Sequence, residues 1–139
     1  MKHSSLERIE DFIAQHHVLS LATSNAAFEL SCCSVFYAYD ASSMGFVFAS
    51  DSKTTHVQHI QANPKVAANI LLETDKVGLI QGLQIQGTCH LVDDVQQKKL
   101  YFKTYPYALA LAPTLWCLHV SSFKLTDNKL GFGKKLYYP

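Results

Sequence analysis

The sequence is poor in arginine, because Arg8 is the single arginine among 139 residues. Arginine is the side chain that most often grips a phosphate or carboxylate with two parallel hydrogen bonds. Any anion bound by this chain must therefore be held by lysine, histidine, hydroxyl groups and backbone N–H groups. The lysines do not form a long stripe, and the formal net charge is only +1, so the sequence does not predict nucleic-acid binding.

Long apolar runs are also missing from the chain. No stretch approaches the roughly 20 consecutive apolar residues that span a bilayer, and residues 1–4 do not lead into the core of a signal peptide. We therefore expect no membrane partner and a cytoplasmic location. A length of 139 residues, 48% of them hydrophobic, suits one core, so residues 1–139 are predicted to form a single domain.

Metal-binding spacings are absent as well. The chain has 4 cysteines and 7 histidines, but no two cysteines have the C-x-x-C spacing of a zinc site. We expect reduced cysteines that fill strand positions. His56 and His59 could share a helix face, but the sequence places no third ligand, so no metal is predicted.

The stretch 44–69 predicts a strand, a capped turn, a short helix and a second strand. The aromatic and β-branched run at 46–49 is typical of a strand, and the polar residues at 50–52 favour a helix cap. Val57 and Ile60 then recur with helical spacing. Asn63-Pro64 ends the helix, because proline cannot continue it.

The turn in this stretch is a candidate anion site. A helix start has unpaired N–H groups and partial positive charge, so it attracts anions. Lys53, Thr54, Thr55 and His56 are expected on the first helical turn, where they add an ammonium, two hydroxyls and an imidazole. The same pattern also fits an ordinary helix cap beside a surface lysine.

The remaining patterns predict a mainly β protein. Ser4-Ser5-Leu6-Glu7 is a capping box that begins a helix to about residue 16. Further helices are expected at 93–105 and 107–111, strands at 18–23, 66–72, 77–80, 82–91 and 115–125, a hairpin involving 28–39, and a glycine-bent strand in the tail 129–139. We therefore predict an antiparallel β-barrel of six to seven strands with small helices on its ends.

The strand expected at 82–91 alternates sharply between apolar and polar side chains. Its faces are Leu83, Ile85, Cys89 and Leu91 on one side, and Gln84, Gln86, Thr88 and His90 on the other. The polar face either meets solvent, as on many antiparallel strands, or lines a ligand site or a subunit interface.

With this pattern, the chain resembles the pyridoxamine 5′-phosphate oxidase-like split barrels, and especially their uncharacterised YhbP-like branch. The matching segments are Gly45-Phe46-Val47-Phe48, Lys53-Thr54-Thr55-His56, Asn63-Pro64, Gln81-Gly82-Leu83-Gln84-Ile85-Gln86-Gly87 and residues 126–135. The resemblance covers nearly the whole chain. It implies an FMN-binding split barrel that forms a homodimer, with the flavin at the interface between the subunits.

The resemblance also implies site residues. In the family the FMN phosphate lies on a Ser-Arg-Lys turn, and in this chain those positions correspond to Thr54, Thr55 and His56, with Lys53 one residue earlier. The remaining cofactor-binding candidates are Ser34, Val35, Phe36, Tyr37, Ala49 and Ser50 along the flavin ring, Gln84 in place of a family arginine, and Trp116 across the interface. The oxidases' C-terminal Arg-Leu-His-Asp-Arg segment is absent, so oxidation of pyridoxamine phosphate is not expected.

The implied function is that of an FMN-dependent oxidoreductase of unknown substrate, with no catalytic acid or base assigned. Two alternatives stay open. The cleft could hold another flat anionic ligand such as haem without redox chemistry, or the chain could be a dimeric scaffold whose cofactor site has decayed.

Overall fold

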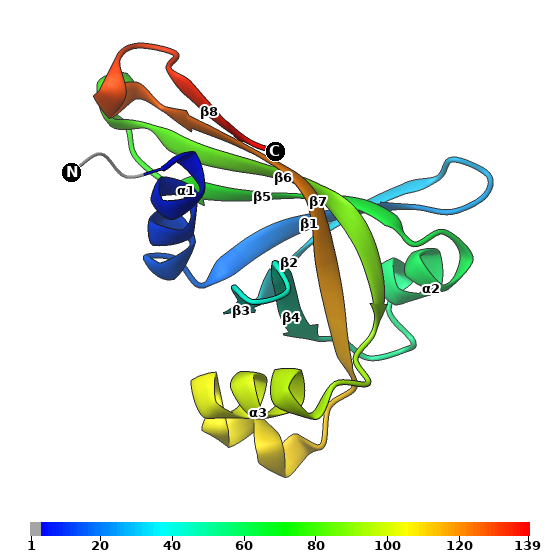
Figure 1. The fold of residues 1–139 in the computed structure, drawn as a ribbon. Coiled ribbons are helices and arrows are strands. Elements are labelled where there is room, and N and C mark those ends of the chain that lie inside the picture. The colour runs from blue at the N-terminus through cyan, green and yellow to red at the C-terminus, as the bar shows by residue number, and fades with distance from the viewer. Residues whose placement is uncertain (1–3) are drawn as a thin grey trace.

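The computed structural model describes residues 4–139, and Figure 1 shows its arrangement. The helices are α1 (Ser5–Ala14), α2 (Thr55–Ala62) and α3 (Val95–Thr104), with short 3₁₀ helices η1 (Val77–Leu79), η2 (Pro106–Leu111) and η3 (Asn128–Leu130). The strands are β1 (Val18–Ser24), β2 (Leu30–Phe36), β3 (Ala38–Asp40), β4 (Gly45–Ala49), β5 (Lys65–Leu72), β6 (Gln81–Leu91), β7 (Leu115–Asp127) and β8 (Lys135–Tyr138).

All the strands belong to one antiparallel sheet. Its order is β2-β1-β5-β6-β7-β4-β3, and β8 pairs with β7 outside this path. The sheet curls so that β2 also contacts β4, and α3 with η2 lies at one end of the molecule (Figure 1). The predicted antiparallel barrel with small helices is confirmed. The sheet has 8 strands within residues 4–139, against the six to seven predicted, and it includes the short strands β3 and β8.

The curled sheet encloses a core of large apolar side chains. Phe46, Phe48 and Phe123 are fully buried there, together with Leu83 and Ile85. Helix α1 adds Ile9, Phe12 and Ile13 to this core. It begins at its predicted cap, because the Ser4 hydroxyl accepts the N–H of Glu7 at 3.1 Å. Cores of this kind supply most of the free energy that stabilises a domain.

Strand β6 follows the predicted alternation except at its end. Leu83, Ile85 and Cys89 are buried as predicted, whereas Leu91, the last residue of the strand, is 58% exposed. The pairing of β6 with β7 is shifted between Gln86 and Gly87. A Cβ atom on Gly87 would collide with the backbone carbonyl of His119, so this position requires glycine.

The segment before β6 is not a strand, so that prediction is wrong. Val77–Leu79 forms the 3₁₀ helix η1, and Val77 is 66% exposed. The side-chain amide of Asn128 donates to the Val77 carbonyl at 2.7 Å, and the Asn128 N–H donates to the Ile80 carbonyl at 3.1 Å. Asn128 therefore supplies the hydrogen bonds for these two carbonyls, whereas the predicted strand would have needed a neighbouring strand to supply them. None of the helices within residues 4–139 is both long and apolar enough to cross a membrane.

Candidate ligand site at the start of α2

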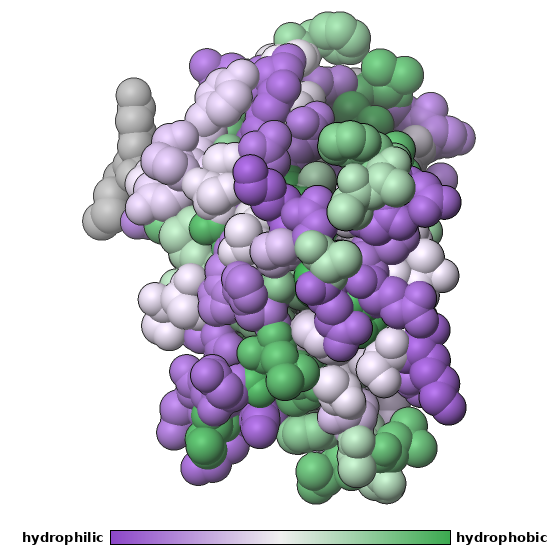
Figure 2. Space-filling model, turned by 90° about the vertical axis from the view of Figure 1, so that its right-hand side faces the viewer, coloured by the Kyte–Doolittle hydropathy of each residue, from purple (hydrophilic) through white to green (hydrophobic). Residues whose placement is uncertain are grey.

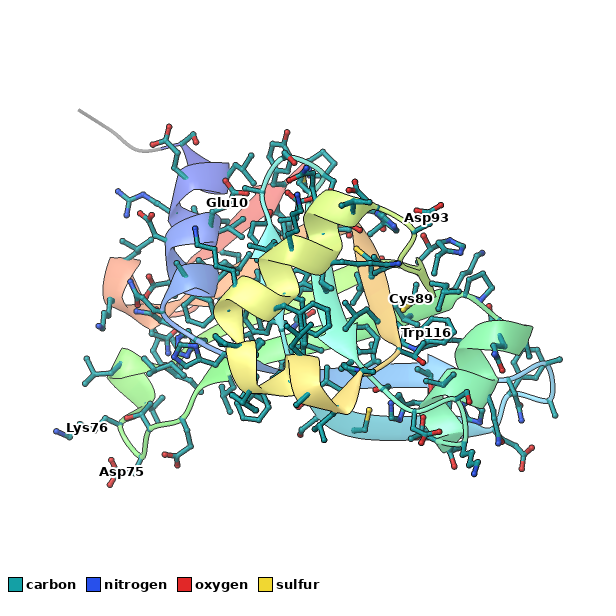
Figure 3. All side chains as sticks on the ribbon, turned by 90° about the horizontal axis from the view of Figure 1, so that it is seen from below. Glu10, Asp75, Lys76, Cys89, Asp93 and Trp116 are labelled. Atoms are coloured by element: carbon teal, nitrogen blue, oxygen red, sulfur yellow. The ribbon has the colours of Figure 1, made fainter. Side chains whose placement is uncertain are left out.

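Strand β4 delivers the turn that begins the site, and β7 holds that turn in place. The Ser50 N–H donates to the Thr114 carbonyl at 3.1 Å, and the indole N–H of Trp116 donates to the Ser50 carbonyl at 3.2 Å. Trp116 is only 5% exposed and lies beside α2 in the view of Figure 3. Within one chain, Trp116 therefore positions the turn from inside the core and presents little surface to a ligand.

Thr54 is the N-cap of α2. Its hydroxyl accepts the N–H of Val57 at 3.3 Å and donates to the Asp51 carbonyl at 2.8 Å. The prediction that Lys53 lies on the first helical turn is therefore wrong, because Lys53 precedes the cap. The reason is that threonine caps a helix well, so the helix begins later than the residues at 50–52 suggested. The Thr54 hydroxyl is committed to this capping role.

The start of α2 keeps N–H groups for a ligand. Within residues 4–139, the amide N–H groups of Thr55 and His56 have no acceptor, and the first turn of α2 holds no acidic residue. The side chains of Lys53 and Thr55 are exposed at the same turn. One negative charge opposes them, because the Asp51 carboxylate accepts the Lys53 N–H at 2.8 Å. The turn therefore offers two amide donors, a hydroxyl and an ammonium to an anion.

The His56 imidazole turns back onto this bend. Its Nε2 atom lies 2.7 Å from the Ser50 hydroxyl oxygen and 3.4 Å from the Thr54 hydroxyl oxygen. Burial, and then the neighbouring His59, lower the pKa of His56 below its ordinary value. The ring is therefore neutral at neutral pH, where Lys53 is left as the cation of the turn.

A pocket of about 460 Å³ opens beside the turn. One side of the pocket is formed by the end of β4 and the turn after it, and the other side by the last residue of η2 and the segment that follows. Its lining residues are Ala49, Ser50, Asp51, Ser52, Leu111, Ala112, Pro113 and Thr114. Sequence reasoning missed residues 111–114, which lie about sixty residues further along the chain. The signal in the sequence is the apolar run that ends at Pro113, and the structure leaves Leu109 and Leu111 of that run exposed.

Strand β2 divides the flavin-ring candidates between its two faces. The Ser34 and Phe36 side chains are exposed, whereas Val35 and Tyr37 point into the core. The Tyr37 hydroxyl donates to the Ile13 carbonyl at 2.6 Å. The Phe36 ring meets Tyr105 edge-on at a centroid distance of 5.9 Å. Only Ser34 and Phe36 can therefore present side chains to a ligand outside the barrel.

The structure does not bring Gln84 to the turn within one chain. Gln84 is exposed on β6 and lines a separate small pocket with Asn69 and Thr126. A larger groove of about 670 Å³ crosses the outer face of β1, β5 and β6 near the C-terminal end of α2. Gln86 and Thr88 line that groove, so the polar face of β6 is open to a ligand or a second subunit.

No metal centre is formed by the part of the chain that the structure describes. Residues 4–139 contain no group of three or more histidine, cysteine, aspartate or glutamate side chains that could hold an ion. The four cysteines are free. Burial raises the pKa of both Cys89 and Cys117 to about 12, so these two thiols stay protonated and act as small apolar side chains.

Comparison with known proteins identifies the family of the chain. The family model described as pyridoxamine 5′-phosphate oxidase matches residues 5–114, which include the whole turn. A UPF0306 protein of Enterobacter sp. (strain 638) is 34% identical over 137 residues, covering 96% of each chain.

Two solved structures share the fold. A heme binding protein from Mycobacterium smegmatis superimposes with a TM-score of 0.82 at 14% identity, over 99% of this chain and 59% of that longer chain. HutZ, the heme storage protein from Vibrio cholerae, gives a TM-score of 0.68 at 12% identity, over 86% of this chain and 92% of its own. The match to the family model and the UPF0306 relative together show that the chain belongs to the pyridoxamine 5′-phosphate oxidase family.

Proposed function

We propose that the protein binds FMN at the start of α2 and acts as a flavin-dependent oxidoreductase. The observation that carries this proposal is the pair of unpaired amide N–H groups of Thr55 and His56, next to a pocket of about 460 Å³. A helix start of this kind is a ready anion site. A flat ring attached to the anion could extend along the end of β4.

The residues present fit the phosphate and the ring in different ways. The phosphate would accept from the N–H groups of Thr55 and His56, the Thr55 hydroxyl and the Lys53 ammonium. The ring would lie along the main chain of Ala49 and Ser50 against the wall at 111–114. Bound FMN would supply the electron chemistry, while the protein orients the ring and excludes water.

A second copy of the chain is part of this proposal, because the pocket is open on one side and η2, whose last residue Leu111 lines it, exposes apolar side chains. The exposed fractions are 72% for Tyr107, 62% for Leu109 and 78% for Leu111 on η2, and 54% for Phe36 on β2. Figure 2 shows apolar side chains gathered at the end of the molecule formed by α3 and η2. Apolar patches on a soluble domain favour association, and a two-fold neighbour over this end would close the ring site.

Haem is the second candidate ligand. Two proteins of the same fold are described as a heme binding protein and a heme storage protein. The observation in this chain that favours haem is the neutral, half-buried His56 imidazole next to the pocket, since neutral imidazole is a common iron ligand. To bind iron through Nε2, His56 would have to give up its hydrogen bond to Ser50.

Ligand titration tests both candidates. The absorption spectrum of the purified protein is recorded first, and ligand-free protein is then titrated with FMN and with haemin. We expect saturable FMN binding that weakens up to tenfold in Lys53→Ala, because one charge-assisted bond is worth about 1.4 kcal/mol. Lys99→Ala, which removes an exposed lysine of α3, is the matched control and should bind like the wild type.

The contradicting outcomes are distinct. An FMN Kd above about 1 mM, which is a binding free energy weaker than about −4 kcal/mol, would remove the flavin proposal. A Soret band that His56→Gln abolishes, without flavin binding, would favour haem. Sedimentation as a monomer at all concentrations would remove the second copy from the site.

A further inference from the structure

The closest side-chain contact of the turn joins a hydroxyl to an imidazole. The Ser50 hydroxyl oxygen lies 2.7 Å from Nε2 of His56, which is within the distance expected of a nucleophile and its general base. Ser50 also lines the pocket of about 460 Å³. Both of its backbone groups are held, by Thr114 and by Trp116, so the hydroxyl starts from a fixed position.

Ser50 is the donor in this contact when the neutral His56 ring carries its proton on Nδ1, which leaves Nε2 as an acceptor. The single hydroxyl proton of Thr54 already goes to the Asp51 carbonyl at 2.8 Å. The Ser50 hydroxyl has no acceptor other than Nε2 among residues 4–139. Burial and His59 lower the pKa of His56, so at neutral pH the ring has a free nitrogen that can accept this proton.

We propose that Ser50 and His56 form a nucleophile and general-base pair that transfers acyl groups from small activated esters in the ligand-free protein. The Ser50 oxygen bonds to the acyl carbon while His56 Nε2 takes the hydroxyl proton. The bond to the leaving oxygen then breaks, and that oxygen takes the proton from His56. Water then attacks the acyl carbon and gives a proton to His56 Nε2. The bond to the Ser50 oxygen breaks, that oxygen takes the proton back from His56, and the free acid leaves. The sum is ester plus water giving acid plus alcohol.

The surroundings of the pair define the class of substrate. The far side of the pocket is formed by residues 111–114, and Asp51 and Ser52 line it next to Ser50, so the space suits a small acyl group such as acetyl. The N–H groups of Thr55 and His56 are the donors available on the same turn for a developing oxyanion. An FMN phosphate at the start of α2 would compete for the same turn, so this activity belongs to the protein without flavin and does not depend on flavin binding.

Covalent trapping tests the proposal. Ligand-free protein is treated with diisopropyl fluorophosphate, and the labelled residue is located by peptide mass spectrometry. We expect one adduct on Ser50 and none in Ser50→Ala. His56→Gln should label at least about a hundredfold more slowly, because a positioned general base contributes about 10²–10⁴ in rate. p-Nitrophenyl acetate should give a burst of p-nitrophenolate that both substitutions abolish.

Two matched variants test whether labelling needs the Ser50–His56 pair or only an exposed serine or histidine. Ser42→Ala removes an exposed serine whose hydroxyl donates to the Asp40 carboxylate at 2.7 Å, and His90→Gln removes an exposed histidine of β6. Both should label at the wild-type rate. Circular dichroism verifies that each variant is folded.

Three results would overturn the proposal. They are no labelling, labelling spread over the exposed serines, and labelling of folded His56→Gln at the wild-type rate. FMN titration of the same preparations reports on the flavin site separately, so failure of one proposal is distinguishable from failure of the other.

Discussion

The starts of α2 and α3 are built alike but differ in charge. At α3 the Asp94 carboxylate accepts the N–H groups of Gln96 at 2.7 Å and Gln97 at 3.4 Å. At α2 the neutral Thr54 hydroxyl accepts one N–H, from Val57. Neither first turn holds an acidic residue, so the difference lies in the cap: a carboxylate occupies the positive end of α3, and a neutral hydroxyl that of α2.

Because of this difference, the start of α3 is a structural cap, whereas the start of α2 is a candidate binding site. Asp and Thr are both good N-caps, with Asp somewhat better, so neutral Thr54 costs little stability. It does leave the partial positive charge of the helix for an external anion. The turn of α2 also lies beside a pocket of about 460 Å³.

The largest effect is expected when the start of α2 is made like that of α3. Thr54→Asp keeps a good cap but places a carboxylate where the phosphate would lie. We expect FMN affinity to fall at least about tenfold, or about 1.4 kcal/mol, through like-charge repulsion. Thr54→Asn, a neutral cap of similar quality, is the control and should bind normally. Equal affinities of the two variants in fluorescence titration would contradict an anion site here.

The next effect is expected when the α3 cap is removed. Asp94→Ala leaves two N–H groups without their acceptor and should lower the free energy of unfolding by about 1 kcal/mol, measured with urea. FMN affinity should not change, because α3 starts away from the turn. Asp93→Ala, which removes the exposed neighbouring carboxylate, should change neither quantity. A comparable loss of FMN affinity in Asp94→Ala would mean that the two helix starts are coupled.

A smaller effect, a gain in FMN affinity, is expected when the negative charge of Asp51 near the start of α2 is removed. Asp51→Asn keeps the oxygen that accepts the Lys53 N–H at 2.8 Å but is uncharged. We expect FMN to bind about threefold more tightly, a change of about 0.6 kcal/mol for an exposed charge near the phosphate. Asp75→Asn, at an exposed site between β5 and β6, should have no effect. A weaker affinity in Asp51→Asn would show that the carboxylate itself organises the turn.

The smallest effect concerns the pH dependence of folding. Burial lowers the pKa of His56 in the folded protein below its ordinary value of 6.5. When the pH falls below about 6.5, His56 therefore takes up a proton more readily in the unfolded chain than in the folded one. Stability should therefore fall as pH drops below about 6.5, and less steeply in His56→Gln. His16 also has a pKa lowered by burial and by His17, so some slope should remain. The slope is measured in urea titrations from pH 5 to 8, and an unchanged slope in folded His56→Gln would contradict the burial of His56.

Sequence reasoning predicted the regular parts of this fold because their causes are local. The capping box at Ser4, the stop at Asn63-Pro64 and the alternation of β6 each depend on residues within a few positions of one another. The position of the candidate turn was predicted for the same reason. The helix boundary was misplaced by a few residues, because several neighbouring polar side chains could each serve as the cap.

Local sequence patterns were enough to predict the antiparallel strands, the short helix after Ser50 and the scarcity of arginine for binding an anion. The surroundings of that turn became known from the folded chain. Trp116 reaches the Ser50 carbonyl from β7, and residues 111–114 form the facing wall. Val77–Leu79 likewise became a 3₁₀ helix through Asn128. The physical reason is range: caps and alternation are fixed between near neighbours in the chain, whereas these contacts join segments about fifty to sixty-six residues apart, which local pattern does not encode.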